Sequence, residues 1–420
     1  MTQKEFIAEE TARCIRCGYC LSNCPTYVVT GVEHSVARGR NYIAKSLLEE
    51  TIEFSKDMKK SVFECLLCGA CIEHCAPSVR TSDIMTAVRA KYIEDKGQPP
   101  LQKYLFNEIL PYPERMTRLM KLVSMGKRTG ISGLVQVLRV FGWFGKNIAN
   151  MEGLLESFPK SFLRDIVPGM KIEKKEDAMK VGYFIGCGID YAFPNVGSAT
   201  INVLKKCGFD IHILENNCCG LPATGYGDFN AARKLARQNL SMMKELDCDV
   251  IITDCASCTS FLTDYPELFP EESEWREIAE ELSKKIMDVT EFLHRHMPDK
   301  VKKLSAEKKV TYHDPCHLGR FLKIKEAPRA LISDIEGVSF RELPESNWCC
   351  GGAGTYNISH YDLSMKILSR KMKNLESTGA ETLVTACPGC MVQLSYGVRK
   401  SKLPVEVKHI SEIIDDSIDE

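Results

Sequence analysis

The sequence lacks any long apolar segment. No run of about 18 uncharged apolar residues, the length that a helix needs to cross a bilayer, occurs in its 420 residues. The first ten residues include Lys4, Glu5, Glu9 and Glu10 and do not resemble the apolar core of a secretory signal. We therefore expect a cytoplasmic protein without a transmembrane segment, either free or held peripherally at the inner face of the membrane.

The sequence also lacks a charge excess and a dinucleotide-binding fingerprint. Its 55 lysines and arginines nearly balance 56 acidic residues, giving a net charge of −1, whereas proteins that bind nucleic acid usually carry a clear basic excess. No nucleic-acid partner is expected. The segment Gly186-Cys187-Gly188 breaks off before the third glycine of the G-x-G-x-x-G motif, so we expect no flavin in this chain.

Cysteine, in contrast, is abundant, with 20 residues. In a short secreted chain so many cysteines would indicate disulfides. This chain is long enough for two or three domains with a large core, and it shows no secretory signal. Thiols grouped at ligand spacings in such a chain predict metal centres.

Eight cysteines form two runs typical of a bacterial ferredoxin, C-x2-C-x2-C-x3-C. The first run is Cys14, Cys17, Cys20 and Cys24, and the second is Cys65, Cys68, Cys71 and Cys75. The fourth cysteine of each run normally binds the other cluster. We therefore assign Cys14, Cys17, Cys20 and Cys75 to one [4Fe-4S] cubane, and Cys65, Cys68, Cys71 and Cys24 to a second. Zinc is the alternative, because it also binds Cys-x-x-Cys pairs, but it does not require two such four-cysteine runs.

Ten further cysteines form two copies of a five-cysteine pattern: one cysteine, a Cys-Cys-Gly segment and a Cys-x-x-Cys pair. The first copy is Cys187, Cys218, Cys219, Cys255 and Cys258, with intervals of 30 and 35 residues. The second is Cys316, Cys349, Cys350, Cys387 and Cys390, with intervals of 32 and 36 residues. Two such copies are very unlikely by chance, so each is interpreted as one iron–sulfur site.

The hydrophobic pattern around these ten cysteines predicts α/β domains. Short apolar runs such as 181–185 and 249–253 alternate with helical periodicity, and each cysteine group follows such a run. Open parallel sheets bind ligands at the carboxyl ends of their strands, so three strand ends can deliver one, two and two thiolates to one point. Gly351, Gly352 and Gly354 would let the backbone approach the centre closely.

The expected fold class is α+β overall, with a helical two-cluster ferredoxin domain followed by two tandem α/β domains with parallel strands. The expected boundaries are 1–95 for the ferredoxin-type domain, 96–178 for a helical connector, 179–270 for the first α/β domain, 271–309 for a helical linker and 310–414 for the second α/β domain.

Three further features have two interpretations each. Residues 115–151 contain seven basic and no acidic residues, which predicts either an ordinary connector or a surface for a membrane or an electron-carrier partner. Arg38-Gly39-Arg40 is expected to be a solvated helix start, with contact to a partner or a cluster as the alternative. Cys207 and Cys248, outside the pattern, are expected to be buried structural thiols, not ligands.

The two five-cysteine copies resemble the cysteine-rich CCG domain. Together with the ferredoxin runs, the domain order resembles the fused iron–sulfur subunit of heterodisulfide reductase and the iron–sulfur subunits of glycolate oxidase and lactate utilisation systems. The segments Arg38–Lys45 and Cys349–Tyr356 resemble the glycolate oxidase branch most. The resemblance to heterodisulfide reductase implies that five cysteines hold a non-cubane [4Fe-4S] cluster, so one or two such clusters are expected in the CCG domains.

Two functions follow from these observations. In the first, the chain is an electron-transfer subunit that relays electrons between a flavoprotein partner, which oxidises a 2-hydroxy acid, and an acceptor. In the alternative, implied by the resemblance to heterodisulfide reductase, it cleaves a disulfide at two facing non-cubane clusters. His313 and His317 would then be candidate proton donors near Cys316, although both could also be loop residues bonded to the backbone. No catalytic residue is assigned. A third hypothesis treats one CCG copy as a structural relic, but both cysteine sets are complete.

Overall fold

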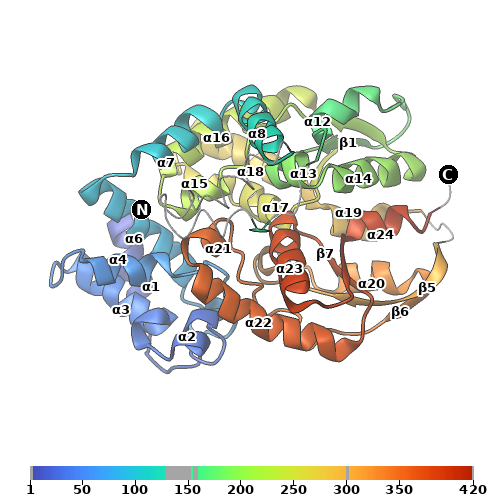
Figure 1. The fold of residues 1–420 in the computed structure, drawn as a ribbon. Coiled ribbons are helices and arrows are strands. Elements are labelled where there is room, and N and C mark those ends of the chain that lie inside the picture. Colours follow the sequence, from blue (N-terminus) through green and yellow to red (C-terminus); the bar gives the residue numbers. More distant parts are fainter. Residues whose placement is uncertain (1–2, 129–152, 155–158, 299–301, 419–420) are drawn as a thin grey trace.

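The computed structural model describes residues 3–128, 153–154, 159–298 and 302–418 (Figure 1). A helical domain in blue lies against two α/β domains, coloured green to yellow and orange to red. Each α/β domain contains a four-stranded sheet in which all strands are parallel. The expected fold class is confirmed.

The N-terminal domain consists of short helices around one small core. Its elements are α1 (Gln3–Ala12), α2 (Pro25–Thr30), η1 (Glu33–Ser35), α3 (Ala37–Leu48), α4 (Lys56–Phe63), α5 (Ala70–Glu73) and α6 (Thr81–Lys96). Ile43 of α3, Val62 of α4, and Ile84 and Val88, one turn apart on α6, share the core. Both ferredoxin runs lie in the loops and helix ends around this core.

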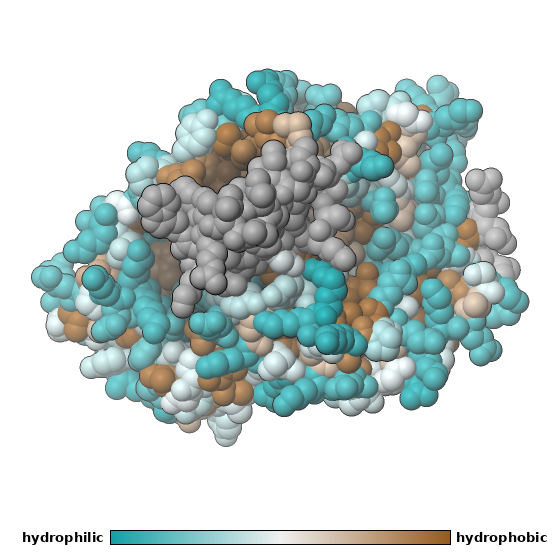
Figure 2. Space-filling view, in the orientation of Figure 1, coloured by the Kyte–Doolittle hydropathy of each residue, from teal (hydrophilic) through white to brown (hydrophobic). Residues whose placement is uncertain are grey.

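A helical segment joins the N-terminal domain to the first sheet. Its described elements are α7 (Pro100–Tyr104), the π-helical turn η2 (Leu105–Ile109), α8 (Pro113–Arg128), α12 (Leu163–Ile166) and η3 (Val167–Gly169). Of the basic stretch 115–151, the structure describes residues 115–128, which belong to α8. Residues 129–151 lie outside the described ranges. Leu119, Leu122, Val123 and Met125 of α8 are exposed, and Figure 2 shows brown apolar atoms near the top of the molecule, in the region of this helix.

The first α/β domain contains strands β1 (Lys180–Tyr183), β2 (Asp210–Ile213), β3 (Val250–Thr253) and β4 (Ile286–Asp288) in the order β2-β1-β3-β4. Its helices are α13 (Cys187–Ala192), α14 (Pro194–Cys207), α15 (Leu221–Gly225), α16 (Phe229–Leu246), α17 (Ala256–Thr263), η4 (Tyr265–Leu268), α18 (Glu274–Ser283) and α19 (Val289–His296). Every residue of the central strand β3 is buried, as expected for a parallel strand with helices on both faces.

The second α/β domain repeats this order. Its strands are β5 (Lys303–Tyr312), β6 (Glu336–Phe340), β7 (Thr382–Thr385) and β8 (Glu406–His409), in the order β6-β5-β7-β8. Its helices are η5 (His317–Phe321), α20 (Glu326–Ser333), α21 (Tyr356–Ser359), α22 (Tyr361–Thr378), α23 (Pro388–Ser401) and α24 (Ile410–Asp415). β7 matches β3 in its central position and its complete burial.

Two expectations from the sequence are wrong in detail. The segment 271–309, expected to be a helical linker, contributes β4 to the first sheet, where Ile251 pairs with Ile286. Three residues between two amphipathic helices are too few for a recognisable strand period. Arg40, expected at a solvated helix start, is buried with 1% of its surface exposed, because it lies on the inner face of α3.

The two α/β domains pack face to face. α14 of the first domain lies along α24 of the second (Figure 1), where Thr200 Oγ1 hydrogen bonds to Ser411 Oγ at 2.9 Å and Lys206 pairs with Asp415. At the centre, α13 packs against α23 and α17 packs against η5. These two contacts join equivalent elements reciprocally, so the two repeats are related by an approximate two-fold arrangement. None of the helices in the described ranges combines the length and apolar character needed to cross a bilayer.

Candidate iron–sulfur sites

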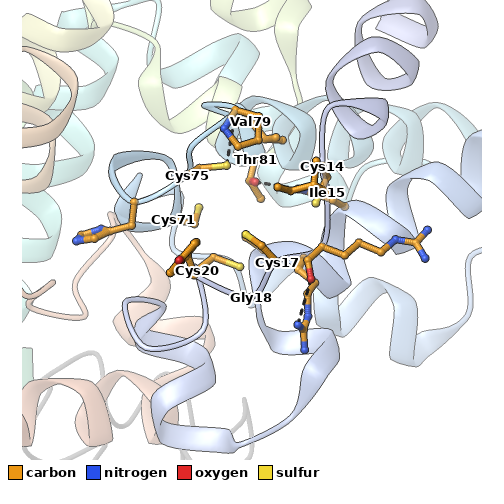
Figure 3. Close-up of a pocket in the computed structure, with 16 residues that line it drawn as sticks. Cys14, Ile15, Cys17, Gly18, Cys20, Cys71, Cys75, Val79 and Thr81 are labelled. Atoms are coloured by element: carbon orange, nitrogen blue, oxygen red, sulfur yellow. Dashed lines mark hydrogen bonds between the residues drawn. The ribbon is translucent and has the colours of Figure 1, made fainter.

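Cysteines from both ferredoxin runs surround one hollow in the N-terminal domain. Figure 3 shows Cys14, Cys17, Cys20, Cys71 and Cys75 around it. The first three come from the loop after α1, and Cys75 comes from the loop before α6. The Val79 N–H donates to Cys75 Sγ at 3.4 Å, so the backbone already stabilises negative charge on one of these sulfurs.

A second hollow lies beside the first. Its lining contains Cys24, Cys65, Cys68 and Cys71. Thus Cys24 lies with the second run and Cys75 with the first, the exchange that the sequence predicts for ligands of two adjacent clusters. Cys71 lines both hollows, so the two sites are immediate neighbours.

The two runs share an unusual backbone conformation. The residue before the second cysteine of each run, Arg16 and Leu67, has a positive φ, of 55° and 53° respectively. Neither residue is glycine, and such values are uncommon for bulky side chains. The repeated left-handed residue lets each loop curl around its hollow, and it is a signal that the spacing of the cysteines did not reveal.

A buried cation lies against the second hollow. Arg40 lines it, donates from Nη1 to Thr26 Oγ1 at 3.1 Å and from Nε to the Ser61 carbonyl at 2.9 Å, and approaches Cys24 Sγ at 4.0 Å. Its Nη2 has no hydrogen-bond partner in the part of the chain that the structure describes. Burial opposes the charge, but Cys65 and Cys24 outweigh it and raise the pKa of Arg40. A positive side chain with a spare donor fits a site that binds a negatively charged group.

The first five-cysteine set converges beyond the carboxyl ends of three strands. Cys187 begins α13 after β1, Cys218 and Cys219 follow β2, and Cys255 and Cys258 follow β3. Their thiols contact one another in sequence: Cys187 with Cys218, Cys218 with Cys219, Cys219 with Cys258, and Cys258 with Cys255. Three strand ends thus bring one, two and two thiols to one place, as the pattern predicts.

The second set repeats this geometry. Cys350 contacts both Cys349 and Cys390, with 3.7 Å between Cys350 Sγ and Cys390 Sγ, and Cys390 contacts Cys387. Cys316 packs in the same cluster as Cys349. Gly351 has a φ of 86°, which lets its N–H turn back and donate to Cys349 Sγ at 3.4 Å.

Thiol contacts also join different sites. Cys68 of the N-terminal domain contacts Cys349 of the second α/β domain. Cys387 of that domain contacts Cys255 of the first, where the Ala256 N–H also bonds to the Ala386 carbonyl at 3.1 Å. The four cysteine groups therefore form a row: the hollow with Cys17, the hollow with Cys68, the second five-cysteine set, and the first.

Two buried arginines tie the N-terminal domain to the α/β domains. Arg320 donates to the Cys68 carbonyl at 3.1 Å and to the Asn347 carbonyl at 2.5 Å, and it pairs with Glu73. Arg89 donates to the Cys65 carbonyl at 2.7 Å and to the Gly225 carbonyl at 2.6 Å. Neither arginine stands out in the sequence, because each reaches backbone carbonyls that are far away along the chain.

The chemistry of the donor sets fits iron–sulfur centres. Burial raises the pKa of Cys316, and burial with the neighbouring Cys65 and Cys68 raises that of Cys71. Buried thiols of this kind stay neutral unless a cation binds their thiolates. Each group also offers three or more sulfur ligands, which favours zinc or iron–sulfur centres over metals that prefer oxygen.

Access from solvent differs along the row. Cys17 is exposed, whereas the remaining cysteines are half-buried or buried. Ile15 and Tyr19 on either side of it are 69% and 70% exposed. At the second five-cysteine set, Cys316 lines a cavity of about 260 Å³ together with Arg320, Lys325 and Arg329. At the first set, Cys187 and Cys218 line a much smaller hollow next to α8 and α12.

The remaining candidates from the sequence fall into two groups. Cys248 is buried and Cys207 half-buried, and neither belongs to the thiol contacts described above. His317 Nδ1 lies 3.1 Å from Ser257 Oγ and 3.7 Å from Cys316 Sγ. His313 lies near Cys350 and Cys390 instead, and its ring is not bonded to the backbone in the described structure.

Comparison with known proteins agrees with this geometry. The chain matches the cysteine-rich CCG domain at residues 181–263 and 310–395, a 4Fe-4S dicluster domain at 10–79, and the linker region of the glycolate oxidase iron-sulfur subunit at 97–155.

Relatives of known description match the same regions. The chain is 32% identical to the probable glycolate oxidase iron-sulfur subunit of Bacillus subtilis, with 96% of this chain and 93% of the relative covered. It is 34% identical to lactate utilization protein A of Shouchella clausii, over 56% of this chain and 98% of the relative. A hypothetical protein from Helicobacter pylori of known structure aligns with a TM-score of 0.43 and 11% identity, covering 80% of this chain and 77% of that protein. The chain therefore belongs to the family of glycolate oxidase iron–sulfur subunits, with a dicluster domain followed by two CCG domains.

Proposed function

We propose that this chain relays electrons within a multi-subunit oxidoreductase, between a flavoprotein that oxidises a 2-hydroxy acid and an electron acceptor. The observation that carries the proposal is the unbroken row of cysteine groups, linked by the contacts of Cys68 with Cys349 and of Cys387 with Cys255. The relatives named above support an iron–sulfur subunit of an oxidoreductase, and the partner, substrate and direction of flow are part of the proposal.

The proposed ligands are the four cysteine groups. Cys14, Cys17, Cys20 and Cys75 hold one [4Fe-4S] cubane, and Cys65, Cys68, Cys71 and Cys24 hold the other. Cys187, Cys218, Cys219, Cys255 and Cys258 hold the centre of the first CCG domain, and Cys316, Cys349, Cys350, Cys387 and Cys390 hold that of the second. When bound, such centres supply one-electron carriers.

Exposure and contacts of the cysteines give the proposed point where electrons enter and the order in which the centres receive them. Cys17 is the exposed member of the row, and the apolar side chains of Ile15 and Tyr19 beside it offer a contact surface for the flavoprotein. Electrons that enter there reach the hollow with Cys68, then the second CCG domain through Cys349, and finally the first CCG domain through Cys255. The proposed order of the two CCG domains is therefore the reverse of their order in the sequence.

The same contacts weaken the disulfide-cleaving alternative. In that mechanism the two CCG centres face each other and each takes one sulfur of a substrate disulfide. Here Cys255 and Cys387, both buried, contact each other between the two centres, so no substrate sulfur fits between these two atoms. The cavity at Cys316 opens on one centre, and the hollow at Cys187 opens on the other.

Anaerobic purification with co-purifying chains tests the proposal. Four [4Fe-4S] centres correspond to about 16 irons per chain. Glycolate or lactate should reduce these centres only when a flavoprotein is present. EPR spectroscopy measures the reduction. A Cys20→Ser variant should lose one cubane and slow this reduction, whereas the matched Cys207→Ser variant should not.

Two results would contradict the proposal. One is a fully loaded chain that no flavoprotein and hydroxy acid reduce. The other is disulfide reduction by the purified chain with an artificial donor, which would favour the alternative.

A further inference from the structure

The imidazole of His313 is buried beside the second CCG site, where it interacts with the side chain of Cys350. His313 is 1% exposed, and among the described residues no group lies at standard hydrogen-bond geometry to either of its ring nitrogens. A neutral imidazole carries one donor and one acceptor nitrogen, and buried polar groups of this kind are rarely left without partners. The side chain of Cys350 can serve one ring nitrogen, so the other requires a partner that the described polypeptide does not supply.

The surroundings of the ring identify the kind of partner. A ring nitrogen of His313 and the sulfurs of Cys350 and Cys390 all lie within 4.8 Å of one another. The two sulfurs are 3.7 Å apart, close to the separation of about 3.8 Å that two thiolates have on one tetrahedral metal with 2.3 Å metal–sulfur bonds. A thiolate could accept the imidazole N–H, but it cannot use the lone pair of the other nitrogen. A metal ion can.

The backbone holds the ring in this position. His313 directly follows β5, its N–H donates to the Val384 carbonyl at 2.9 Å, and its carbonyl accepts from Thr385 Oγ1 at 3.2 Å. Both bonds are to β7, the strand that leads to Cys387. The ring is thus fixed by the same strand ends that present the thiols.

The first repeat provides an internal comparison. Phe184 stands three residues before Cys187, as His313 stands three residues before Cys316. The Phe184 N–H donates to the Ile252 carbonyl at 2.9 Å, which matches the bond of His313 to Val384. Phe184 is fully buried in the apolar core. The fold therefore accepts an apolar ring at this position, and the imidazole of the second repeat is not required for packing.

We propose that His313 binds the metal centre of the second CCG domain through one ring nitrogen, beside Cys350 and Cys390, and gives it a nitrogen donor that the first CCG centre lacks. This inference rests on the proposed function, because it takes the centre to be iron–sulfur. Imidazole is neutral, so a centre that takes His313 in place of one of its five thiolates has a higher reduction potential. The two CCG centres, although held by the same cysteine pattern, would then differ in potential.

Pulsed EPR on the anaerobically purified full chain tests the inference. Samples with natural and ¹⁵N-labelled histidine are compared in a Cys219→Ser background, which removes the signal of the first CCG centre. The expected result is a strong nitrogen coupling, typical of a direct iron–nitrogen bond, that changes with the isotope. His313→Phe should abolish this coupling and shift the midpoint potential of the second CCG centre downward.

Two further variants separate ligation from structural damage. His313→Cys keeps a donor at this position, so the centre should be retained while the nitrogen coupling is lost. His317→Gln is the matched control, because His317 lies beside Cys316 but bonds to Ser257, and it should leave the coupling unchanged.

The outcomes distinguish this inference from the proposed function. A second CCG signal with no nitrogen coupling, or with the weak coupling of a hydrogen bond, would overturn the role of His313 and leave the relay intact. Persistence of the strong coupling in His313→Phe would also overturn it. Absence of iron from the second CCG domain would overturn both.

Discussion

The thiols of Cys68 and Cys349 contact each other across the boundary between the dicluster domain and the second CCG domain. Both side chains are buried, and they share an apolar cluster with Leu66, Trp348 and Tyr356. The thiols of the N-terminal domain therefore contact the second CCG site and not the first, although Arg89 also bonds to the Gly225 carbonyl of the first CCG domain. The first CCG site lies at the other end of the row of cysteine groups, where Cys255 contacts Cys387 of the second CCG site.

The order of the row can be tested by breaking it at two places. Cys349→Ser should stop electrons from reaching both CCG centres, because the first lies behind the second. Cys219→Ser should leave reduction of the second CCG centre unchanged and affect only the first. Freeze-quench EPR with a donor that docks at the N-terminal domain would measure both. Normal reduction of the first CCG centre in Cys349→Ser would contradict the order.

Arg40 should set the potential of the adjacent cubane. Its guanidinium lies 4.0 Å from Cys24 Sγ and is buried, so its charge favours the reduced, more negative centre. In a medium of effective dielectric constant about 20, Arg40→Met should lower the midpoint potential by on the order of 100 mV. Arg40→Lys, which keeps the charge, should shift it less.

The matched control for this experiment is Arg38→Met. Arg38 pairs with Glu33 at the surface, so solvent and the carboxylate screen its charge. Suppose that Arg38→Met shifts the midpoint potential of the same cubane as much as Arg40→Met does. The burial of Arg40 would then not be the cause of its effect on that potential.

Arg320 should hold the dicluster domain against the second CCG domain. Arg320→Met removes a buried partner of Glu73 and the bond to the Cys68 carbonyl. Glu73 keeps Lys325 as a partner. The main loss is therefore that of the hydrogen bonds to the buried carbonyl of Cys68 and to the carbonyl of Asn347, which costs about 1–3 kcal/mol, and reduction of the second CCG centre should slow. Urea unfolding under anaerobic conditions measures the free energy.

Arg295→Met serves as the comparison, because Arg295 forms an exposed pair with Glu291, a type worth about 0–1 kcal/mol. Equal destabilisation by the two substitutions would show that Arg320 is not a structural link between the domains.

Asp288 should make stability fall as the pH rises. Burial raises its pKa to about 7 from 3.8, although Thr290 and Thr259 donate hydrogen bonds to it. Between these values the unfolded chain has lost the proton that the folded protein still holds. Stability therefore decreases from about pH 4 to pH 7, by at most about 4 kcal/mol, and then levels off.

Asp288→Asn should remove this loss, so the difference in Tm between the variant and the parent should grow from pH 5 to pH 7 and then stay constant. The exposed Asp362→Asn is the control and should show no such trend. A difference that does not vary with pH would show that Asp288 does not titrate in this range.

Much of the fold could be predicted from the sequence because the pattern is local. Apolar runs such as 249–253 end just before cysteines, and parallel strands present their carboxyl ends on one edge, so convergence of each five-cysteine set follows from the position of the cysteines at the strand ends. β4 escaped prediction because Ile286, Met287 and Asp288 gain their strand character from pairing with β3. Arg40 was misinterpreted because a charged segment indicates solvent exposure unless a buried negative group is known to lie opposite it.

The sequence by itself determined the kinds of site and the donors that each can offer: two ferredoxin runs, two CCG sets and a histidine where the first repeat has Phe184. Spacing along the chain limits which thiols can meet within one domain, because neighbouring residues and adjacent strand ends cannot move far apart. Only the tertiary structure decided how the sites are joined. The contacts of Cys68 with Cys349 and of Cys255 with Cys387 arise from packing between domain surfaces, which no interval between cysteines encodes.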